Sequence, residues 1–276
     1  MVAPPKLAIL PNAKIYLEQS WKQAGPPAWD VVSCLEEAKT KGYQWAFTFE
    51  TGVLMLRSLE NKNLDKIKVD FSSGNMAYRQ HHGQGRGELL AKAVGVKKHH
   101  ALSVLDVTAG LGKDGFILAS LGCEVTMLER SPIVAALLQN GLDRATKEID
   151  LLPIVERMHF FKMDAIEFLQ KTNNNSADRT LAPGFDCIYL DPMFPENKKS
   201  RLVKKDMRAF RLLVGEDFDS SDLFEMAMAF GAHRLVVKRH RHDPPLGAIK
   251  PEVCFTGKTS RFDVYIHHPR SECTQT

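Results

Sequence analysis

The chain has 276 residues, of which 44% are hydrophobic and 25% are charged, and its formal net charge is +4. These proportions exclude collagen-like, low-complexity and intrinsically disordered proteins, and they indicate a folded chain with a full hydrophobic core. Because no apolar run approaches the ~18 residues that a membrane-spanning helix needs, and no export signal is present, we expect no membrane partner.

Residues 1–78 are predicted to form a small α+β domain. The alternating apolar residues of Trp45–Phe49, a break at Gly52 and the run Val53–Leu56 are typical of a β-hairpin. A third strand is expected at Lys66–Phe71.

Residues 79–276 are predicted to form a larger, doubly wound α/β domain. From residue 101 onward, short apolar runs alternate with helical patterns, which is typical of βαβ units around a parallel sheet. Its strands are expected at Ser103–Val107, Glu124–Leu128, Met158–Phe161, Asp186–Leu190 and Arg234–Lys238. Two closing runs, Val253–Phe255 and Phe262–Ile266, have no helix between them and therefore predict a C-terminal antiparallel hairpin at the sheet edge.

The helix after the second of these strands has clear end signals. Ser131 is a suitable N-cap, and Pro132 suits the first turn. An apolar stripe follows, made of Ile133, Val134, Leu137 and Leu138. Gly141 is expected to weaken the end of this helix.

Cysteine usage and charge distribution indicate the environment of the protein. The five cysteines form an odd set without a C-x-x-C pair, which argues against a disulfide framework and against a thiolate zinc site. We therefore expect reduced thiols, a cytoplasmic location and no bound metal.

Positive charge is concentrated in residues 79–98, 192–211 and 234–243. If these stretches fold onto one face they would attract a polyanion, whereas separate solvated surfaces are the alternative.

A glycine turn follows the first strand of the expected parallel sheet. The run Ala109-Gly110-Leu111-Gly112-Lys113-Asp114-Gly115 leads from that strand into a helix. Because Gly110 and Gly112 carry no side chain, a ligand can lie against their backbone at the carboxyl ends of the strands. This spacing alone fits a nicotinamide dinucleotide equally well, so an oxidoreductase is an alternative class.

Acidic residues follow the next two strands. Glu129 lies 23 residues after Asp106, where a carboxylate can accept both ribose hydroxyls of an adenosine-containing ligand; a solvated strand end is the alternative. Asp164 fits a helix N-cap with Glu167 three residues later. From the same place Asp164 could also accept from the exocyclic amine of a purine, with Met163 beside the ring.

The strongest chemical signal ends the fourth strand, in the run Leu190-Asp191-Pro192-Met193-Phe194-Pro195. The Asp191 carboxylate and the carbonyl of Pro192 would accept from one planar amine while the ring of Phe194 stacks on the attached base. The lone pair of such an amine is delocalised and is a poor nucleophile. Two acceptors on its N–H groups favour the pyramidal form that attacks a methyl donor. An ordinary strand end would explain Asp191 and Pro192 alone.

Together these motifs resemble the Rossmann-like class of S-adenosylmethionine-dependent amino-methyltransferases. Within that class, the run 191–195 and the residues that follow it, 199–215, resemble the RsmJ family of small-subunit ribosomal RNA guanine-N2 methyltransferases. The similarity covers about residues 71–266 and includes Gly85–Glu88, Thr108–Gly112, Met127–Arg130, Val236–Arg239 and Arg261–Tyr265.

The resemblance implies an activity and a set of site residues. It implies methyl transfer from S-adenosylmethionine to the N2 amine of a guanosine in 16S ribosomal RNA, free or in the small ribosomal subunit. A methyltransferase acting on adenine N6 or on another planar amine in RNA, DNA or protein is the alternative. The expected cofactor-binding residues are Gly110, Gly112, Lys113, Asp114, Glu129, Arg130, Met163, Asp164 and Asp191, and the expected catalytic residues are Asp191, Pro192 and Phe194.

Overall fold

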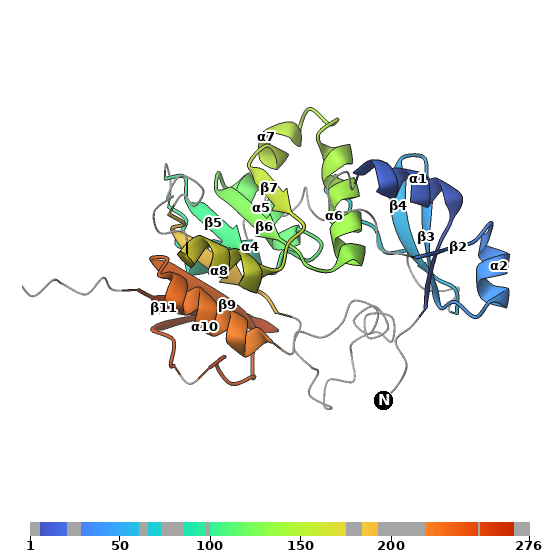
Figure 1. Cartoon of the computed structure of the whole chain (residues 1–276). Coiled ribbons are helices and arrows are strands. Elements are labelled where there is room, and N and C mark those ends of the chain that lie inside the picture. Colours follow the sequence, from blue (N-terminus) through green and yellow to red (C-terminus); the bar gives the residue numbers. More distant parts are fainter. Residues whose placement is uncertain are drawn as a thin grey trace, which may run out of the picture.

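A computed structural model describes residues 6–20, 29–60, 66–72, 86–97, 100–174, 184–192, 219–247 and 249–267. Within these ranges the chain forms two β-sheets, one of four strands and one of seven (Figure 1). No helix in the same ranges is long and apolar enough to cross a membrane.

The four-stranded sheet belongs to the N-terminal part and has the strand order β2-β1-β3-β4. Its elements are β1 (Leu7–Ile9), α1 (Pro11–Ser20), β2 (Asp30–Val31), α2 (Leu35–Thr40), β3 (Trp45–Glu50) and β4 (Val53–Ser58). Strands β3 and β4 form an antiparallel hairpin, which confirms that prediction. Strand β1 pairs in parallel with both β2 and β3, an arrangement that the sequence patterns did not indicate.

The third strand expected at Lys66–Phe71 was a wrong prediction. One antiparallel bridge joins Ile67 to Leu56, with two backbone hydrogen bonds of 2.9 Å. Beyond the bridge the segment leaves the hairpin, because Val69 and Phe71 are buried in a core that includes helices of the C-terminal half.

The seven-stranded sheet has the order β10-β11-β9-β8-β5-β6-β7. Its parallel strands are β5 (Ser103–Asp106), β6 (Glu124–Leu128), β7 (Met158–Phe161), β8 (Cys187–Leu190) and β9 (Arg234–His240). The antiparallel hairpin of β10 (Val253–Thr256) and β11 (Ser260–Ile266) pairs with β9 through β11. The predicted doubly wound sheet with a C-terminal antiparallel hairpin is therefore confirmed.

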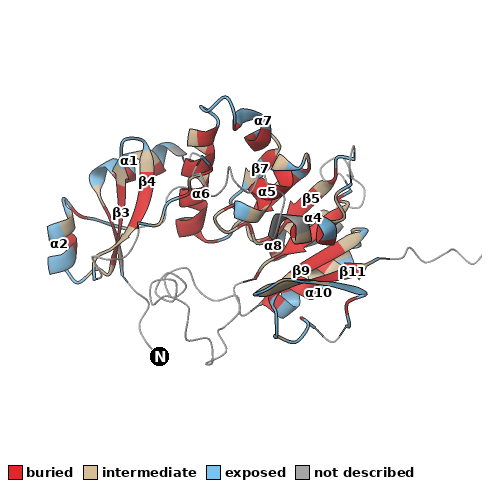
Figure 2. Cartoon of the chain, turned by 180° about the vertical axis from the view of Figure 1, so that it is seen from behind, coloured by how far each residue is buried: buried red, intermediate tan, exposed pale blue. Residues whose placement is uncertain are grey.

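Helices cover both faces of this sheet. They are α4 (Arg86–Val94), α5 (Lys113–Ser120), α6 (Pro132–Ala145), α7 (Leu152–Val155), α8 (Ala165–Asn174) and α10 (Ser220–Phe230). Alternate strand residues point to opposite sides. Val104 and Tyr189 lie in a core cluster with residues of α4 to α7, whereas Leu105 and Ile188 lie in a second cluster with α8 and α10. Figure 2 shows the buried strands between these helices.

The strand order reverses between β5 and β8. From β5 the chain moves outward through β6 and β7, then returns to β8 and continues on the other side to β9. In open sheets of this type, ligands bind at the carboxyl ends of the strands where the order reverses. The glycine turn follows β5 and Asp191 follows β8, so both flank this point.

Helix α6 lies between the two sheets (Figure 1) and is buried along most of its length. The hydroxyl of Ser131 caps it by accepting the N–H of Val134 at 3.5 Å, and Pro132 occupies its first turn, as predicted. One core cluster contains residues of α6, of β4 and of the seven-stranded sheet. The two halves thus share a hydrophobic core. The domain boundary predicted after residue 78 lies outside the described residues and stays a prediction.

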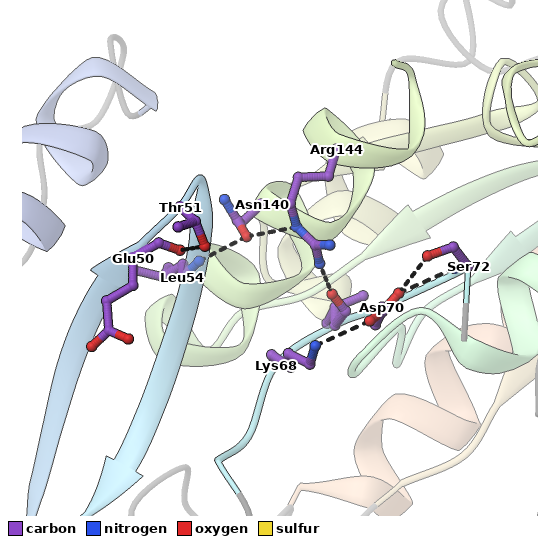
Figure 3. Close-up of polar contacts among 9 residues, drawn as sticks. Glu50, Thr51, Leu54, Lys68, Asp70, Ser72, Asn140 and Arg144 are labelled. Carbon is purple, nitrogen blue, oxygen red and sulfur yellow. Dashed lines mark hydrogen bonds and ion pairs between the residues drawn. The ribbon is translucent and has the colours of Figure 1, made fainter. Parts of the chain in front are cut away.

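Polar contacts reinforce this joint (Figure 3). The side chain of Asn140 is 2% exposed, accepts the N–H of Leu54 at 2.9 Å and donates to the carbonyl of Gly52 at 3.1 Å. One turn further along α6, the guanidinium of Arg144 donates to the carbonyl of Val69. Helix α6 therefore holds both the β3–β4 hairpin and the segment 66–72.

Gly141 does not end α6, which continues to Ala145. A Cβ at position 141 would lie 2.3 Å from Cγ1 of Val69 and 3.3 Å from Cε2 of Phe71. The missing side chain lets the segment 66–72 pack directly on the helix.

Candidate active site

The turn after β5 adopts a conformation that suits glycine. Gly110 and Gly112 have φ angles of +54° and +73°, which other residues rarely adopt. A Cβ at Gly112 would lie 2.5 Å from Cδ1 of Leu138, so this glycine lets the turn pack on α6. Among the described residues beyond its chain neighbours, a Cβ at Gly110 would meet only the carbonyl oxygen of Thr108, at 3.9 Å. The packing of the described residues on the turn therefore requires glycine at position 112 but not at position 110.

Glu129 follows β6, and its carboxylate holds the glycine turn. Oε2 accepts the N–H of Gly110 at 3.0 Å, and Oε1 accepts the N–H of Ser131 at 2.7 Å. Because each carboxylate oxygen can accept more than one hydrogen bond, this arrangement is compatible with added ribose hydroxyls. The structure brings Glu129 and Gly110 together, as a shared cofactor site requires.

Asp164 caps the helix after β7. Its Oδ1 accepts the N–H groups of Ile166 at 2.9 Å and Glu167 at 3.1 Å, so the N-cap interpretation is confirmed. The half-buried Met163 is held by its N–H, which donates to the carbonyl of Glu129 at 3.2 Å. Both residues lie at the same sheet edge as the glycine turn.

Arg130 joins this edge to helix α10. Its guanidinium donates two hydrogen bonds to Asp219, at 2.5 and 3.0 Å, and Nη1 lies 3.6 Å from Oδ2 of Asp164. The hydrogen bonds from Arg130 lower the pKa of Asp219 below its ordinary value. Asp219 was absent from the predicted site, because a contact across 89 residues leaves no local pattern. Lys113, at the start of α5, is exposed.

Asp191 follows β8 and belongs to a charged cluster. Nζ of Lys238 lies 2.6 Å from Oδ2 of Asp191 and 2.7 Å from Oδ2 of Asp114. The hydroxyl of Tyr189 donates to the same oxygen of Asp114 at 2.7 Å. The sequence predicted Asp114 and Asp191 for the site but not Lys238. The ammonium group of Lys238 joins the two carboxylates.

The backbone of Asp191 is fixed against β5. Its N–H donates to Oγ1 of Thr108 at 2.6 Å, and the N–H of Thr108 donates to Oδ1 of Asp106 at 3.0 Å. Asp106 is 1% exposed, and burial raises its pKa to about 8, with a smaller contribution from the carboxylates of Asp114 and Asp191. At neutral pH Asp106 is therefore mainly protonated and adds little negative charge.

The charge states within the cluster follow from its surroundings. Burial alone would lower the pKa of Lys238, but the carboxylates of Asp191 and Asp114 raise it above the ordinary value. Burial raises the pKa of Tyr189 well above its ordinary value, so the phenol stays protonated and remains a donor. The sequence carried a signal for Lys238, a charged residue at the end of an apolar strand.

Some predicted features lie outside the described residues. Phe194 is one of them, as is the basic stretch 193–211, so the stacking ring stays a prediction. Pro192 is described and buried. Among the described residues, no group of three or more His, Cys, Asp or Glu could hold a metal ion.

The fold and the site together define a class. A doubly wound sheet with a glycine turn after its first strand and an acid after its second is typical of proteins that bind an adenosine-containing cofactor. The family model for S-adenosylmethionine-dependent methyltransferases matches residues 32–267. A crystal structure of such a methyltransferase from Neisseria gonorrhoeae is 30% identical, with a TM-score of 0.70, and the similarity covers 98% of this chain and 100% of that chain.

Curated relatives narrow the class. The chain is 50% identical over 200 residues to ribosomal RNA small subunit methyltransferase J from Thioalkalivibrio sulfidiphilus. These 200 residues cover 72% of this chain and 76% of the relative. It is 46% identical over 219 residues to the enzyme of the same name from Shewanella oneidensis. These 219 residues cover 79% of this chain and 84% of that relative. The chain belongs to this family of S-adenosylmethionine-dependent methyltransferases, as the sequence motifs predicted.

Proposed function

We propose that this enzyme transfers a methyl group from S-adenosylmethionine to the exocyclic N2 amine of a guanosine in small-subunit (16S) ribosomal RNA. The names of relatives that are 45–50% identical support this substrate. The single structural observation that carries the chemistry is the Asp191 carboxylate, held beside the glycine turn where the strand order reverses. The proposed partner is the RNA or the small subunit in the cytoplasm.

The residues present fit the cofactor. The missing side chain of Gly110 would let it lie against the backbone of the turn, and Glu129 is fixed where it can accept ribose hydroxyls. When bound, S-adenosylmethionine supplies a methyl group that its sulfonium already activates. In this proposal the cofactor-binding residues are those predicted from the sequence: Gly110, Gly112, Lys113, Asp114, Glu129, Arg130, Met163, Asp164 and Asp191.

Asp191 and Pro192 are the proposed acceptors for the guanine amine. The side chain of Asp191 is 38% exposed, so a substrate can reach it although Lys238 binds one of its oxygens. Acceptors on both N–H groups would favour the pyramidal amine, and orientation toward the activated methyl group would account for most of the rate. Phe194 is the proposed stacking ring.

Incubation with labelled S-adenosylmethionine and undermodified ribosomal RNA tests the function. Free RNA and intact small subunits are compared, and the product is digested to nucleosides. The proposal expects labelled N2-methylguanosine. Labelled N6-methyladenosine, or label in ribosomal protein, would instead assign the alternative substrates.

The same assay tests the role of Asp191. Asp191→Ala should abolish turnover far more than it weakens cofactor binding, because its main contribution is to the attacking amine in the transition state. The matched control is Asp222→Ala, an exposed acid in the first turn of α10, which should keep wild-type turnover. Full activity of Asp191→Ala would refute the mechanism.

A further inference from the structure

Lys238 is brought to Asp191 by the register of two parallel strands. Leu190 of β8 pairs with Val237 of β9, so Asp191 and Lys238 each come one residue later at the same sheet edge. Residues two apart on a strand face the same side, and in both strands that side carries helix α5. Helix α5 supplies Asp114, the third member of the cluster.

The ammonium group of Lys238 holds two carboxylates in place. It lies within 2.7 Å of an oxygen of Asp114 and 2.6 Å of an oxygen of Asp191, and its side chain is only 18% exposed. Because the Lys238 side chain is largely buried, these close pairs are screened less than pairs between fully exposed side chains. The pair therefore fixes the orientation of the Asp191 carboxylate as well as its charge.

We propose that Lys238 is a positioning residue for methyl transfer: its ammonium group keeps the carboxylates of Asp191 and Asp114 together, ionised and correctly oriented for the acceptor amine. This inference rests on the proposed role of Asp191. Lys238 itself touches neither the base nor the methyl group in this arrangement. It acts through Asp191, which must accept from the amine during the attack.

The charge of Lys238 balances the carboxylates of Asp191 and Asp114, because the other groups named here carry no positive charge. Tyr189 on β8 is a neutral donor, the buried carboxyl of Asp106 lies on β5, and β11 presents Phe262 opposite Lys238. Without the ammonium group, the carboxylates of Asp191 and Asp114 would repel one another, and one of them would take up a proton. A protonated Asp191 would be a weaker acceptor for the amine.

A titration without any substrate tests the electrostatic part of the proposal. The protein is labelled with ¹³C at the aspartate carboxyl carbons, and the signal of Asp191 is assigned with Asp191→Asn. In Lys238→Met the pKa of Asp191 should rise by about 1–3 units, whereas Lys238→Arg, which keeps the charge, should stay near the wild type. Lys238→Gln removes the charge but keeps a polar group, so it replaces Lys238→Met if that variant does not fold.

Kinetics test the link to the reaction. At neutral pH, Lys238→Met should lower kcat about tenfold or more with little change in the KM for RNA, mainly because the Asp191 carboxylate loses its orientation. Because a carboxyl group without its cation is protonated more readily, the acid limb of the kcat profile should move to higher pH by the same shift as the titration. The matched control is Lys171→Met, which removes an exposed ion pair of 2.5 Å with Glu167 and should leave the profile unchanged.

The outcomes separate this inference from the proposed function. An unshifted Asp191 titration in a folded Lys238→Met or Lys238→Gln variant overturns the inference, and so does a pH profile that superimposes on the wild type. A wild-type protein that methylates no RNA overturns the proposed function, while the titration still reports on the cluster. A partial recovery of activity in Lys238→Met at high pH, where Asp191 regains its charge but not its orientation, supports the inference and the proposed function.

Discussion

Glu129 holds the glycine turn in this structure, and in the proposed function the same carboxylate also binds the ribose of the cofactor. Glu129→Ala should weaken binding of S-adenosylmethionine by about 1.5–3 kcal/mol, since a charge-assisted contact is lost and the N–H of Gly110 loses its acceptor. This corresponds to a Kd about 10- to 150-fold higher, measured by calorimetry.

The matched control lies on the same strand. Glu124 begins β6 at the opposite end of the sheet, is exposed, and pairs with His159 at 3.1 Å. Glu124→Ala should therefore bind the cofactor like the wild type. An unchanged Kd in Glu129→Ala would place the ribose elsewhere.

Asp106 makes the stability of the protein depend on pH. Burial raises its folded pKa to about 8, so between about pH 4 and pH 8 the unfolded chain releases this proton while the folded chain keeps it. The free energy of unfolding should fall with rising pH across this window. Asp106→Asn keeps an acceptor for Thr108 and has no charge to bury. The melting temperature of the variant minus that of the wild type should therefore increase from pH 4 to pH 8 and stay constant above pH 8. A constant difference across the window would contradict the buried, protonated carboxyl.

At the scale of elements, the missing side chain of Gly141 lets the segment 66–72 pack directly on α6. Alanine favours a helix by about 1 kcal/mol over glycine, but here its Cβ would lie 2.6 Å from Cβ of Val69, an atom that cannot move without its backbone. We expect Gly141→Ala to destabilise the protein by about 1–2 kcal/mol in urea unfolding.

A double mutant separates this clash from other effects. With Val69→Gly in the same chain, which removes both Cγ1 and Cβ of residue 69, Gly141→Ala should cost much less, and the two changes should not be additive. Gly184→Ala, where a Cβ would meet no atom of the described residues within 4 Å, should stay within about 0.5 kcal/mol of the wild type. Equal losses at positions 141 and 184 would show that close packing is not the cause.

The elements that the sequence predicted well are those with local signals. Strands with continuous apolar runs and helix α6, with Ser131 and Pro132 at its start, were identified correctly. The segment Lys66–Phe71 was wrongly predicted as a strand, because an extended segment whose buried side chains pack on helices shows the same alternation. Strand β2 has two residues, too few for a periodic pattern.

The candidate site was predictable in part for the same reason. Glu129 and Asp191 directly follow strands, Gly110 and Asp164 come within four residues of a strand end, and parallel strands bring their carboxyl ends to one edge. The contacts among the side chains depend on strand order and register instead. The pair of Lys238 with Asp114 spans 124 residues, and only the placement of β9 beside β8 brings that lysine into the site.

At the scale of the whole molecule, the N-terminal sheet depends on the C-terminal half. Its other hydrophobic cluster is small, with Ala8, Val32 and Ala38 as its buried residues. Leu54 and Leu56 of β4 are buried in the core that includes α6. Without the C-terminal half, the buried face of β4 would be exposed, and the small second cluster would be left to stabilise the N-terminal sheet.

We therefore expect a fragment of residues 1–78 to be unfolded in isolation. Its amide protons should exchange at the rates of an unfolded chain, whereas those of β3 and β4 in the full chain should be protected. Adding a separate fragment of residues 79–276 should restore protection. A cooperative thermal transition of the isolated fragment would show that it is an independent domain.

The contact of β4 with α6 also has a consequence for biosynthesis. The hairpin leaves the ribosome first, but the helix that covers its apolar face ends at Ala145, roughly 90 residues later. Because translation adds about 5–20 residues per second, Leu54 and Leu56 of the nascent hairpin stay exposed for on the order of ten seconds. Chaperones that bind apolar segments of nascent chains should therefore engage this protein during translation of residues 60–145, and release it once α6 has emerged.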